Sequence, residues 1–242
     1  MDIFELIKNN DLEGIKQLVD NGANIEAKGI YIYTPLIFAS YKGNLEIIKY
    51  LISKGAKIET KNIHGNTSLI CASCSGYLEI IKYLISKGAN IEAKDIYIYT
   101  PLIFASYKGN LEIVKYLISK GANIEAKDDN GNTALICASL TGNLEVIKYL
   151  ISKGANIEAK NKSGNTSLIF ASYFGHLEIV KYLISKGANI EAKNKFGNTS
   201  LICASSHGYL EIVEYLISRG ANIEAKNIHG NTSLICASCS GY

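Results

Sequence analysis

A nine-residue segment returns along the chain at a fixed step of 33 residues, and this step constrains the fold more than any other feature. The segment Ser-Lys-Gly-Ala-Asn-Ile-Glu-Ala-Lys occupies residues 86–94, 119–127, 152–160 and 185–193. A period between about 20 and 50 residues is typical of arrays in which supersecondary units stack side by side. The sequence therefore predicts one elongated stack rather than a globule built around a single core.

The residues of one repeat, 61–93, predict a turn followed by two short helices. Gly65 is able to adopt a positive φ in the turn, and Thr67 stands where a helix N-cap is wanted. Apolar residues at helical spacing then indicate helices over about 68–75 and 78–86, each ended by a glycine. A helix pair of this size cannot bury its own apolar faces, so its neighbours must cover them.

Three motifs of the repeat carry a family resemblance. Residues 34–39 read Thr-Pro-Leu-Ile-Phe-Ala, residues 43–52 read Gly-Asn-Leu-Glu-Ile-Ile-Lys-Tyr-Leu-Ile, and Gly-Ala follows at 55–56. The unit resembles an ankyrin repeat, a family with a 33-residue period and a Thr-Pro-Leu-His-x-Ala signature. The resemblance covers the whole chain and implies an all-α solenoid of stacked helix-turn-helix pairs with protruding β-hairpin loops.

The chain departs from that family pattern at two positions. Isoleucine replaces the signature histidine in every repeat, and the signature proline is present only at Pro35 and Pro101. We expect both changes to lower the stability of each repeat without changing the fold.

We expect residues 1–242 to form a single ankyrin-repeat domain. Its parts would be an N-terminal cap (1–27), six full repeats (28–60, 61–93, 94–126, 127–159, 160–192 and 193–225) and a truncated repeat (226–242). Residues 227–242 repeat residues 62–77 without a difference, but in the earlier copy a second helix follows. We hypothesise that the chain is the front of a longer array or a fragment of one.

Charge and hydropathy limit which binding partners and which cell compartment the sequence predicts for this protein. Twenty-five basic and 22 acidic residues alternate along the chain and leave a net charge of +3, which does not favour nucleic acid. No apolar run approaches the roughly 20 residues that span a bilayer, and the acidic start does not match a signal peptide. We expect a monomer in the cytoplasm or the nucleus that needs no cofactor.

Six cysteines are present, and most of them share one repeat position with phenylalanine. That position holds Cys71, Cys137, Cys203 and Cys236 in four repeats and Phe38, Phe104 and Phe170 in the other three. Exchange of phenylalanine and cysteine indicates an apolar pocket and reduced thiols inside the cell. A zinc site built on Cys-x-x-Cys at 71–74 or 236–239 would need two more ligands nearby, for which His64 and His229 are the only candidates, so we expect neither zinc nor redox chemistry.

Function should lie where the repeats differ and side chains are exposed. Two such places qualify. The first is the set of five-residue loop tips, at 29–33, 62–66, 95–99, 128–132, 161–165, 194–198 and 227–231. The second is the residue pair before each glycine that separates the two helices of a repeat, at 41–42, 74–75, 107–108, 140–141, 173–174 and 206–207. The resemblance implies that these line a concave groove that binds a partner protein. The candidate binding residues are Tyr31, Tyr33, Tyr41, Tyr97, Tyr99, Tyr107, Leu140, Tyr173, Phe174, Phe196 and His207.

Alternatives remain open at this stage. The aromatic residues, with Tyr41, Tyr107 and Tyr173 in alternate repeats, could be copies left by duplication, and the array could be a scaffold or spacer of a larger protein. An enzyme needs unlike residues that converge in one pocket, and a uniform array offers none. We therefore expect no catalysis. The tips with Ile32 and Ile98 in place of glycine should differ in shape from the others, because β-branched residues resist a positive φ.

Overall fold

The computed structural model describes residues 2–242, which form fifteen α-helices and one short 3₁₀ turn and no β-strand. Contacts divide the chain into two compact units. The N-terminal unit comprises the residues up to 105 together with 112–123, and the C-terminal unit comprises residues 106–111 and 124–242. The expected all-helical architecture of paired helices is confirmed, and the loops between the pairs end in turns.

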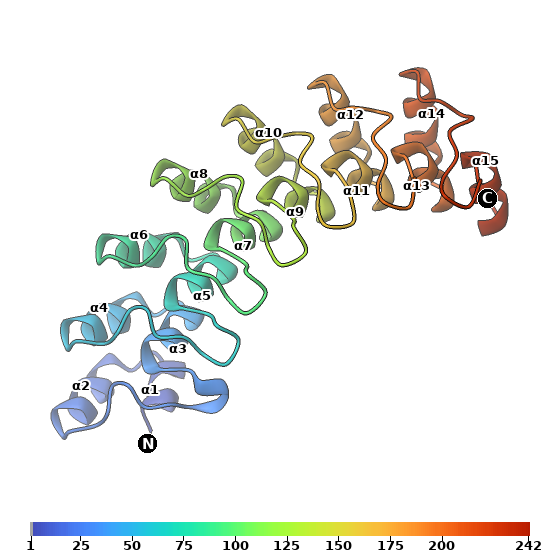
Figure 1. Ribbon diagram of the computed structural model, residues 1–242. Helices are drawn as coiled ribbons and strands as arrows, with labels where there is room; N and C mark the ends of the chain where they lie inside the picture. The colour runs from blue at the N-terminus through green and yellow to red at the C-terminus, as the bar shows by residue number, and fades with distance from the viewer. Residues whose placement is uncertain (1) are drawn as a thin grey trace. The chain divides into compact units, whose positions relative to one another are not determined.

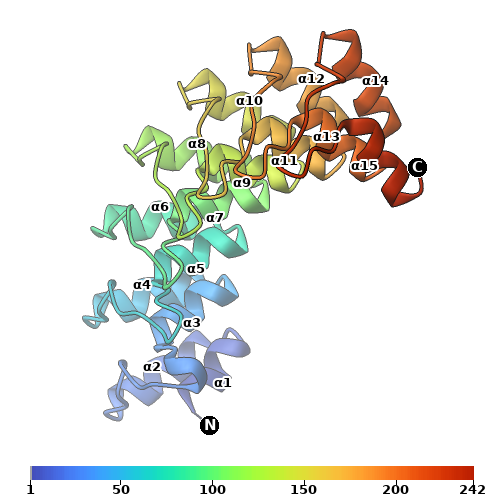
Figure 2. The same cartoon turned by 45° about the vertical axis from the view of Figure 1, so that its right-hand side comes forward.

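The N-terminal unit is built from two rows of helices (Figures 1 and 2). In one row α1, α3 and α5 pack in order, and in the other row α2, α4 and α6 do so. The helices of this unit are α1 (Ile3–Lys8), α2 (Leu12–Asp20), α3 (Pro35–Lys42), α4 (Leu45–Ser53), α5 (Ser68–Ser75), α6 (Leu78–Ser86), the start of α7 (Pro101–Lys108) and most of α8 (Leu111–Ser119).

The C-terminal unit has the same arrangement. Helices α9, α11, α13 and α15 follow one another in one row, and α10, α12 and α14 form the second. These helices are α9 (Ala134–Leu140), α10 (Leu144–Ser152), α11 (Ser167–Tyr173), α12 (Leu177–Ser185), α13 (Ser200–Ser206), α14 (Leu210–Ser218) and α15 (Ser233–Ser240).

The helix ends follow from local chemistry. The Thr67 hydroxyl accepts the backbone N–H of Ile70 at 3.4 Å, which caps α5, and Gly76 ends that helix with φ 89°. The cap repeat uses different residues for the same tasks: Asp2 caps α1, and Asn10 replaces the inter-helix glycine with φ 55°. Both helices of residues 61–93 therefore begin and end where the sequence predicts.

Neighbouring repeats in each unit are joined by a recurrent polar contact. A glutamate before each tip accepts the backbone N–H of the residue 31 positions later, at 2.7–2.9 Å. The glutamates are Glu26, Glu59 and Glu92 in the N-terminal unit and Glu125, Glu158 and Glu191 in the C-terminal unit. Each repeat thus holds its successor through a side chain as well as through apolar packing.

The tip around Ile98 keeps the glycine geometry without a glycine. Ile98 has φ 62°, close to the 74° of Gly65, and donates its N–H to the Asp95 carbonyl as Gly65 donates to Asn62. The expectation of a different shape is therefore wrong for this tip, because its cross-turn bonds hold the backbone in the left-handed region. The first tip does differ, since Tyr31 and Ile32 both have φ 58°.

The cysteines and the tyrosines of the second helices take part in the packing of each unit. All six thiols are free, and Cys71, Cys137 and Cys203 are buried. Burial raises the pKa of Cys71 and of Cys203 to about 12, and it raises that of Cys137 as well. The second-helix tyrosines are half-buried, each under a lysine or arginine head group about 5.5 Å from the ring centre, as Lys87 lies over Tyr83 at 5.6 Å.

The left-handed Ile98 predicts a gain in stability on substitution by glycine. We expect Ile98→Gly to be about 1 kcal/mol more stable than the matched control Ile96→Gly, because only Ile98 carries the left-handed strain. Both variants add the same entropy to the unfolded chain. Urea denaturation checks this, and equal stability of the two variants would show that the tip is unstrained.

The buried thiols predict a large difference in reactivity. At neutral pH we expect a thiol reagent to label the exposed Cys239 within minutes, whereas Cys71, Cys137 and Cys203 react only as fast as the chain opens. Mass spectrometry of the labelled peptides measures this. Equal labelling of Cys137 and Cys239 would contradict the packing.

Candidate functional site

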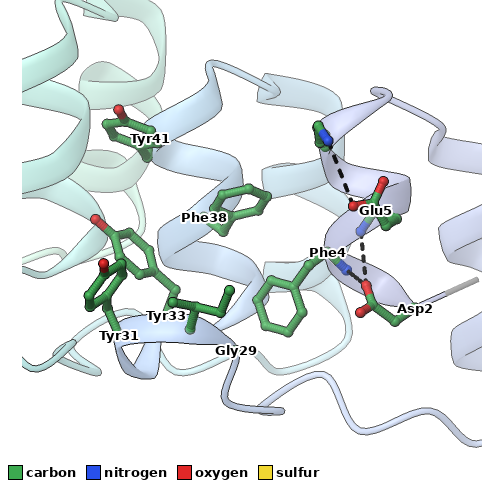
Figure 3. A pocket seen from close by; sticks show the side chains of 10 residues that line it. Asp2, Phe4, Glu5, Gly29, Tyr31, Tyr33, Phe38 and Tyr41 are labelled. Atoms are coloured by element: carbon green, nitrogen blue, oxygen red, sulfur yellow. Dashed lines mark hydrogen bonds and ion pairs between the residues drawn. The ribbon is translucent and has the colours of Figure 1, made fainter.

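An aromatic pocket lies in the N-terminal unit, where α1, the first tip and α3 meet (Figure 3). It measures about 490 Å³, and the rings of Phe4, Tyr33, Phe38 and Tyr41 line it. Phe38 packs edge-on against Phe4 at 5.8 Å and against Tyr33 at 6.1 Å, and Tyr33 lies 6.3 Å from Tyr41. The first tip and α3 thus line one pocket together, through Tyr33 and Tyr41.

Charged residues surround this pocket, but most of them already form hydrogen bonds, ion pairs or contacts with aromatic rings. The Asp2 carboxylate accepts the N–H groups of Phe4 and Glu5, and Lys8 pairs with Glu5 at 3.7 Å. The Lys42 ammonium lies 5.5 Å from the Phe38 ring centre and 5.4 Å from that of Tyr41. The pocket is therefore apolar inside and offers aromatic faces and edges.

The tips of the N-terminal unit expose apolar side chains in succession. Ile30 is 80% exposed, Tyr31 60%, Ile96 54% and Tyr97 58%, and Ile63 in the tip between them is 44% exposed. Backbone hydrogen bonds join these tips: the N–H of Ile63 donates to the Tyr31 carbonyl at 3.2 Å, and that of Ile96 to the His64 carbonyl at 3.0 Å. The apolar side chains therefore sit on a connected rim.

The fifth residue of a tip packs on the aromatic position of the first helix that follows. Tyr99 is half-buried with its ring 5.0 Å from that of Phe104, which repeats the pairing of Tyr33 with Phe38. Burial, and to a smaller extent nearby cysteines and Tyr41, raises the pKa of Tyr33 above its usual value. Tyr33 and Tyr99 thus support the surface more than they extend from it.

An aromatic cluster marks the first-helix ends of the C-terminal unit. Tyr173 and Phe174, each 42% exposed, have ring centres 4.9 Å apart, and the His207 ring lies 4.2 Å from that of Tyr173, tilted by 57°. The Nδ1 atom of His207 lies 3.0 Å from the Cys203 carbonyl. These three predicted residues are brought together from α11 and α13, which are adjacent in one row.

The remaining predicted residues of the C-terminal unit lie outside that cluster. Tyr107 is 43% exposed, Phe196 is 54% exposed at a tip, and Leu140 is half-buried at the end of α9. Tyr41 belongs to the other unit, so the proposed stripe through alternate repeats stays a prediction. Sequence analysis missed Phe4 and Ile30; the five-residue spacing of aromatic residues was a signal for the Tyr33–Phe38 contact but not for Phe4.

The exposed apolar residues have a clear distribution. Between residues 2 and 209, every large hydrophobic side chain recorded as exposed lies in a tip or at the end of a first helix and the turn after it. These are Ile30, Tyr31, Ile32, Tyr41, Ile63, Tyr77, Ile96, Tyr97, Ile98, Tyr107, Tyr173, Phe174 and Phe196. The second helices in that range instead carry Glu–Lys pairs on their outer sides.

Metal-binding clusters and membrane-spanning helices are both absent from residues 2–242. No group of three or more histidine, cysteine or acidic side chains is placed to hold a metal ion in that range. No described helix has both the length and the apolar character that crossing a membrane requires.

The rows of helix pairs, their glycine-ended helices and their connected tips define a helical-repeat protein of the class whose units stack side by side. Comparison with family models then identifies the repeat. Models of ankyrin repeats match residues 3–95, 97–161 and 168–242, and a second ankyrin-repeat model matches residues 141–184. The chain therefore belongs to the ankyrin-repeat family. A comparison with curated proteins found no match.

The raised pKa of Tyr33 predicts a pH effect on stability. The folded unit holds the Tyr33 proton more tightly than the unfolded chain, so stability should fall as pH rises through about 10. Tyr33→Phe should reduce that alkaline loss, whereas the exposed control Tyr31→Phe should not. Urea midpoints at about pH 8 and pH 11 measure this, and an unchanged alkaline loss in Tyr33→Phe would refute it.

Proposed function

We propose that this chain is a non-catalytic binding module that holds a partner protein on its tips and first-helix ends. The single observation that carries the proposal is the distribution of exposed apolar side chains. Ankyrin repeats are generally protein-interaction modules, and in this chain the tips and helix ends expose Ile30, Tyr31, Tyr97 and Tyr173. Tyrosine is enriched among residues that dominate binding energy because it buries a large ring at low entropic cost.

The chemistry of the surface favours a protein over nucleic acid. The aromatic pocket and the apolar rim offer hydrophobic area, while most second-helix lysines are paired with a glutamate three residues before them. Phosphate recognition needs unpaired basic side chains gathered on one face. The proposed partner is therefore a protein segment that inserts apolar side chains. The proposal also takes the chain to act as a monomer within the cell.

Substitution of exposed tyrosines tests this surface. In a quantitative binding assay with an isolated partner, we expect Tyr31→Ala with Tyr97→Ala, or Tyr107→Ala with Tyr173→Ala, to weaken binding at least tenfold. The matched control Lys82→Ala with Lys148→Ala changes exposed second-helix residues and should leave the affinity within twofold.

The affinities of the two tyrosine variants and of the lysine control decide whether the proposed surface binds the partner. Loss of binding in either tyrosine pair, with an unchanged circular dichroism spectrum, supports the proposed surface. Full affinity in both tyrosine pairs, or loss in the lysine control, would place the binding site elsewhere.

A further inference from the structure

The second residue of a tip has a different character in the two units. In the C-terminal unit the first three tips carry a charge there, at Asp129, Lys162 and Lys195, and Lys162 pairs with Asp129 at 3.3 Å. In the N-terminal unit this residue is isoleucine in all three tips, and each of these isoleucines is at least 44% exposed. They are called the isoleucine column: Ile30, Ile63 and Ile96.

A second column of exposed side chains runs beside the first. The third residue of the same tips is Tyr31, His64 or Tyr97, and all three are exposed. The Tyr31 and His64 rings lie 6.1 Å apart, so rings of successive tips are neighbours. Each tip of the N-terminal unit therefore offers two exposed side chains, an isoleucine followed by a ring.

Hydrogen bonds between the tips limit the spacing of the isoleucine column. The N–H of Ile63 donates to the Tyr31 carbonyl at 3.2 Å, and the N–H of Ile96 donates to the His64 carbonyl at 3.0 Å. Standard bond lengths along this path keep the Cα atoms of successive isoleucines within about 11 Å of each other. Packed helices, which set the step between repeats, lie about 8–10 Å apart. A partner that contacts all three tips therefore needs apolar side chains about every 10 Å.

An α-helix is the regular backbone that matches both this step and the two columns. Seven residues of a helix rise about 10.5 Å and place two apolar residues, at the a and d positions, on one face. A β-strand returns to the same face about every 6.6 Å, so its side chains fall out of step with the tips. Polyproline II has a step of about 9 Å but presents one residue per turn on a face, which leaves one column uncovered.

A row of lysines runs along the start of these tips. Lys28, Lys61 and Lys94 directly precede the three tips and are exposed. The Lys61 ammonium donates to the Lys94 carbonyl at 2.8 Å, which is a neutral acceptor. No carboxylate within residues 2–242 forms an ion pair with any of the three. These residues are called the lysine row.

The acids close to the lysine row in sequence bind backbone groups instead. Glu26, Glu59 and Glu92 each accept a backbone N–H of the following repeat at 2.8–2.9 Å. Asp95 accepts two N–H groups of its own tip, at 2.8 and 2.9 Å. The lysine row therefore complements carboxylates that a partner brings.

We propose that the tips of the N-terminal unit bind an acidic amphipathic α-helix of a partner protein, with one heptad to each repeat. The a and d residues of that helix cover the two columns, and the acids beside them pair with the lysine row. This inference rests on the proposed function, to which it adds the shape and charge of the partner. The tips of the C-terminal unit do not bind the same helix, because an apolar stripe would desolvate Asp129, Lys162 and Lys195.

The experiment uses the full chain and a labelled three-heptad peptide with leucine at a and d and glutamate at e and g. Lactam bridges on its outer face hold the helix, and repulsion between the glutamates opposes self-association. Two comparison peptides carry the same numbers of leucine and glutamate, one with leucine at every second residue and one proline-rich with leucine at every third. We expect fluorescence anisotropy to show that the helical peptide binds at least tenfold more tightly than either.

Neutral substitutions in the chain locate the bound helix. Ile30→Ser with Ile96→Ser should weaken binding of the helical peptide at least tenfold. The matched control is Ile228→Ser, which changes a 63% exposed isoleucine at the same tip position of the C-terminal unit. This control should leave the affinity within twofold, and circular dichroism checks that each variant stays folded.

A second peptide, with glutamine in place of glutamate at e and g, tests the lysine row. We expect the glutamate peptide to bind severalfold more tightly than the glutamine peptide at low salt. The preference should disappear at high salt, and it should disappear in the variant Lys28→Gln with Lys94→Gln, because both remove the same charge attraction.

Several results would overturn this inference. These are no binding of the helical peptide, binding of a comparison peptide that is equal or tighter, an equal loss in Ile228→Ser, and a glutamate preference that survives in the lysine variant. Failure of the proposed function gives a different result. If no helical peptide binds but Tyr31→Ala with Tyr97→Ala still weakens binding of an isolated partner, the tips bind a protein of another shape and only the helix is excluded.

Discussion

The burial of each helix pair by its neighbours is the constraint on which the rest of this structure depends. Leu69 and Leu234 stand at the same place in identical sequences, and only the covered one is inside. Burying one such leucine is worth about 2 kcal/mol, and a single pair of eight- or nine-residue helices has no other way to gain it. A hydrogen bond to a glutamate supplements this nondirectional packing with a fixed contact between repeats, as when Glu158 accepts the N–H of Asn189 at 2.7 Å.

That constraint explains why most of the variation between repeats lies in tips and helix ends. Core positions must match the repeat before and the repeat after, so Leu84, Leu117 and Leu150 occur in step and are all fully buried. A tip is joined to its neighbours by backbone hydrogen bonds and by a few side-chain contacts, such as that of Asn161 Nδ2 with Asn132 Oδ1 at 2.9 Å, so its other side chains are free to change. The structure even tolerates Ile98 in the left-handed region there, because the hydrogen bonds of the tip are independent of the side chain.

Helix boundaries could be predicted because they follow from short-range chemistry, such as the Thr67 cap and the left-handed Gly76. The aromatic pocket could not, because it depends on Phe4 of α1 lying against Phe38 of α3, 34 residues later. Phe4 lies in the cap repeat, which departs from the repeat pattern, so no other copy shows its place. The tyrosines of the tips were predicted as binding residues. The sequence did not distinguish Tyr31, whose side chain is exposed, from Tyr33, which packs against Phe38 and supports the surface.

Duplication and binding are not exclusive explanations of the aromatic residues. Residues 30–48 and 96–114 are identical except at their last position, which is the mark of copying. Yet Tyr33 meets Phe38 edge-on at 82°, next to Phe4, whereas Tyr99 lies over Phe104 at 37° and closer, at 5.0 Å. The surroundings differ because the cap repeat supplies Phe4 to only one of the copies. A copied sequence therefore acquires distinct surroundings from its place in the stack, so identical residues present different surfaces.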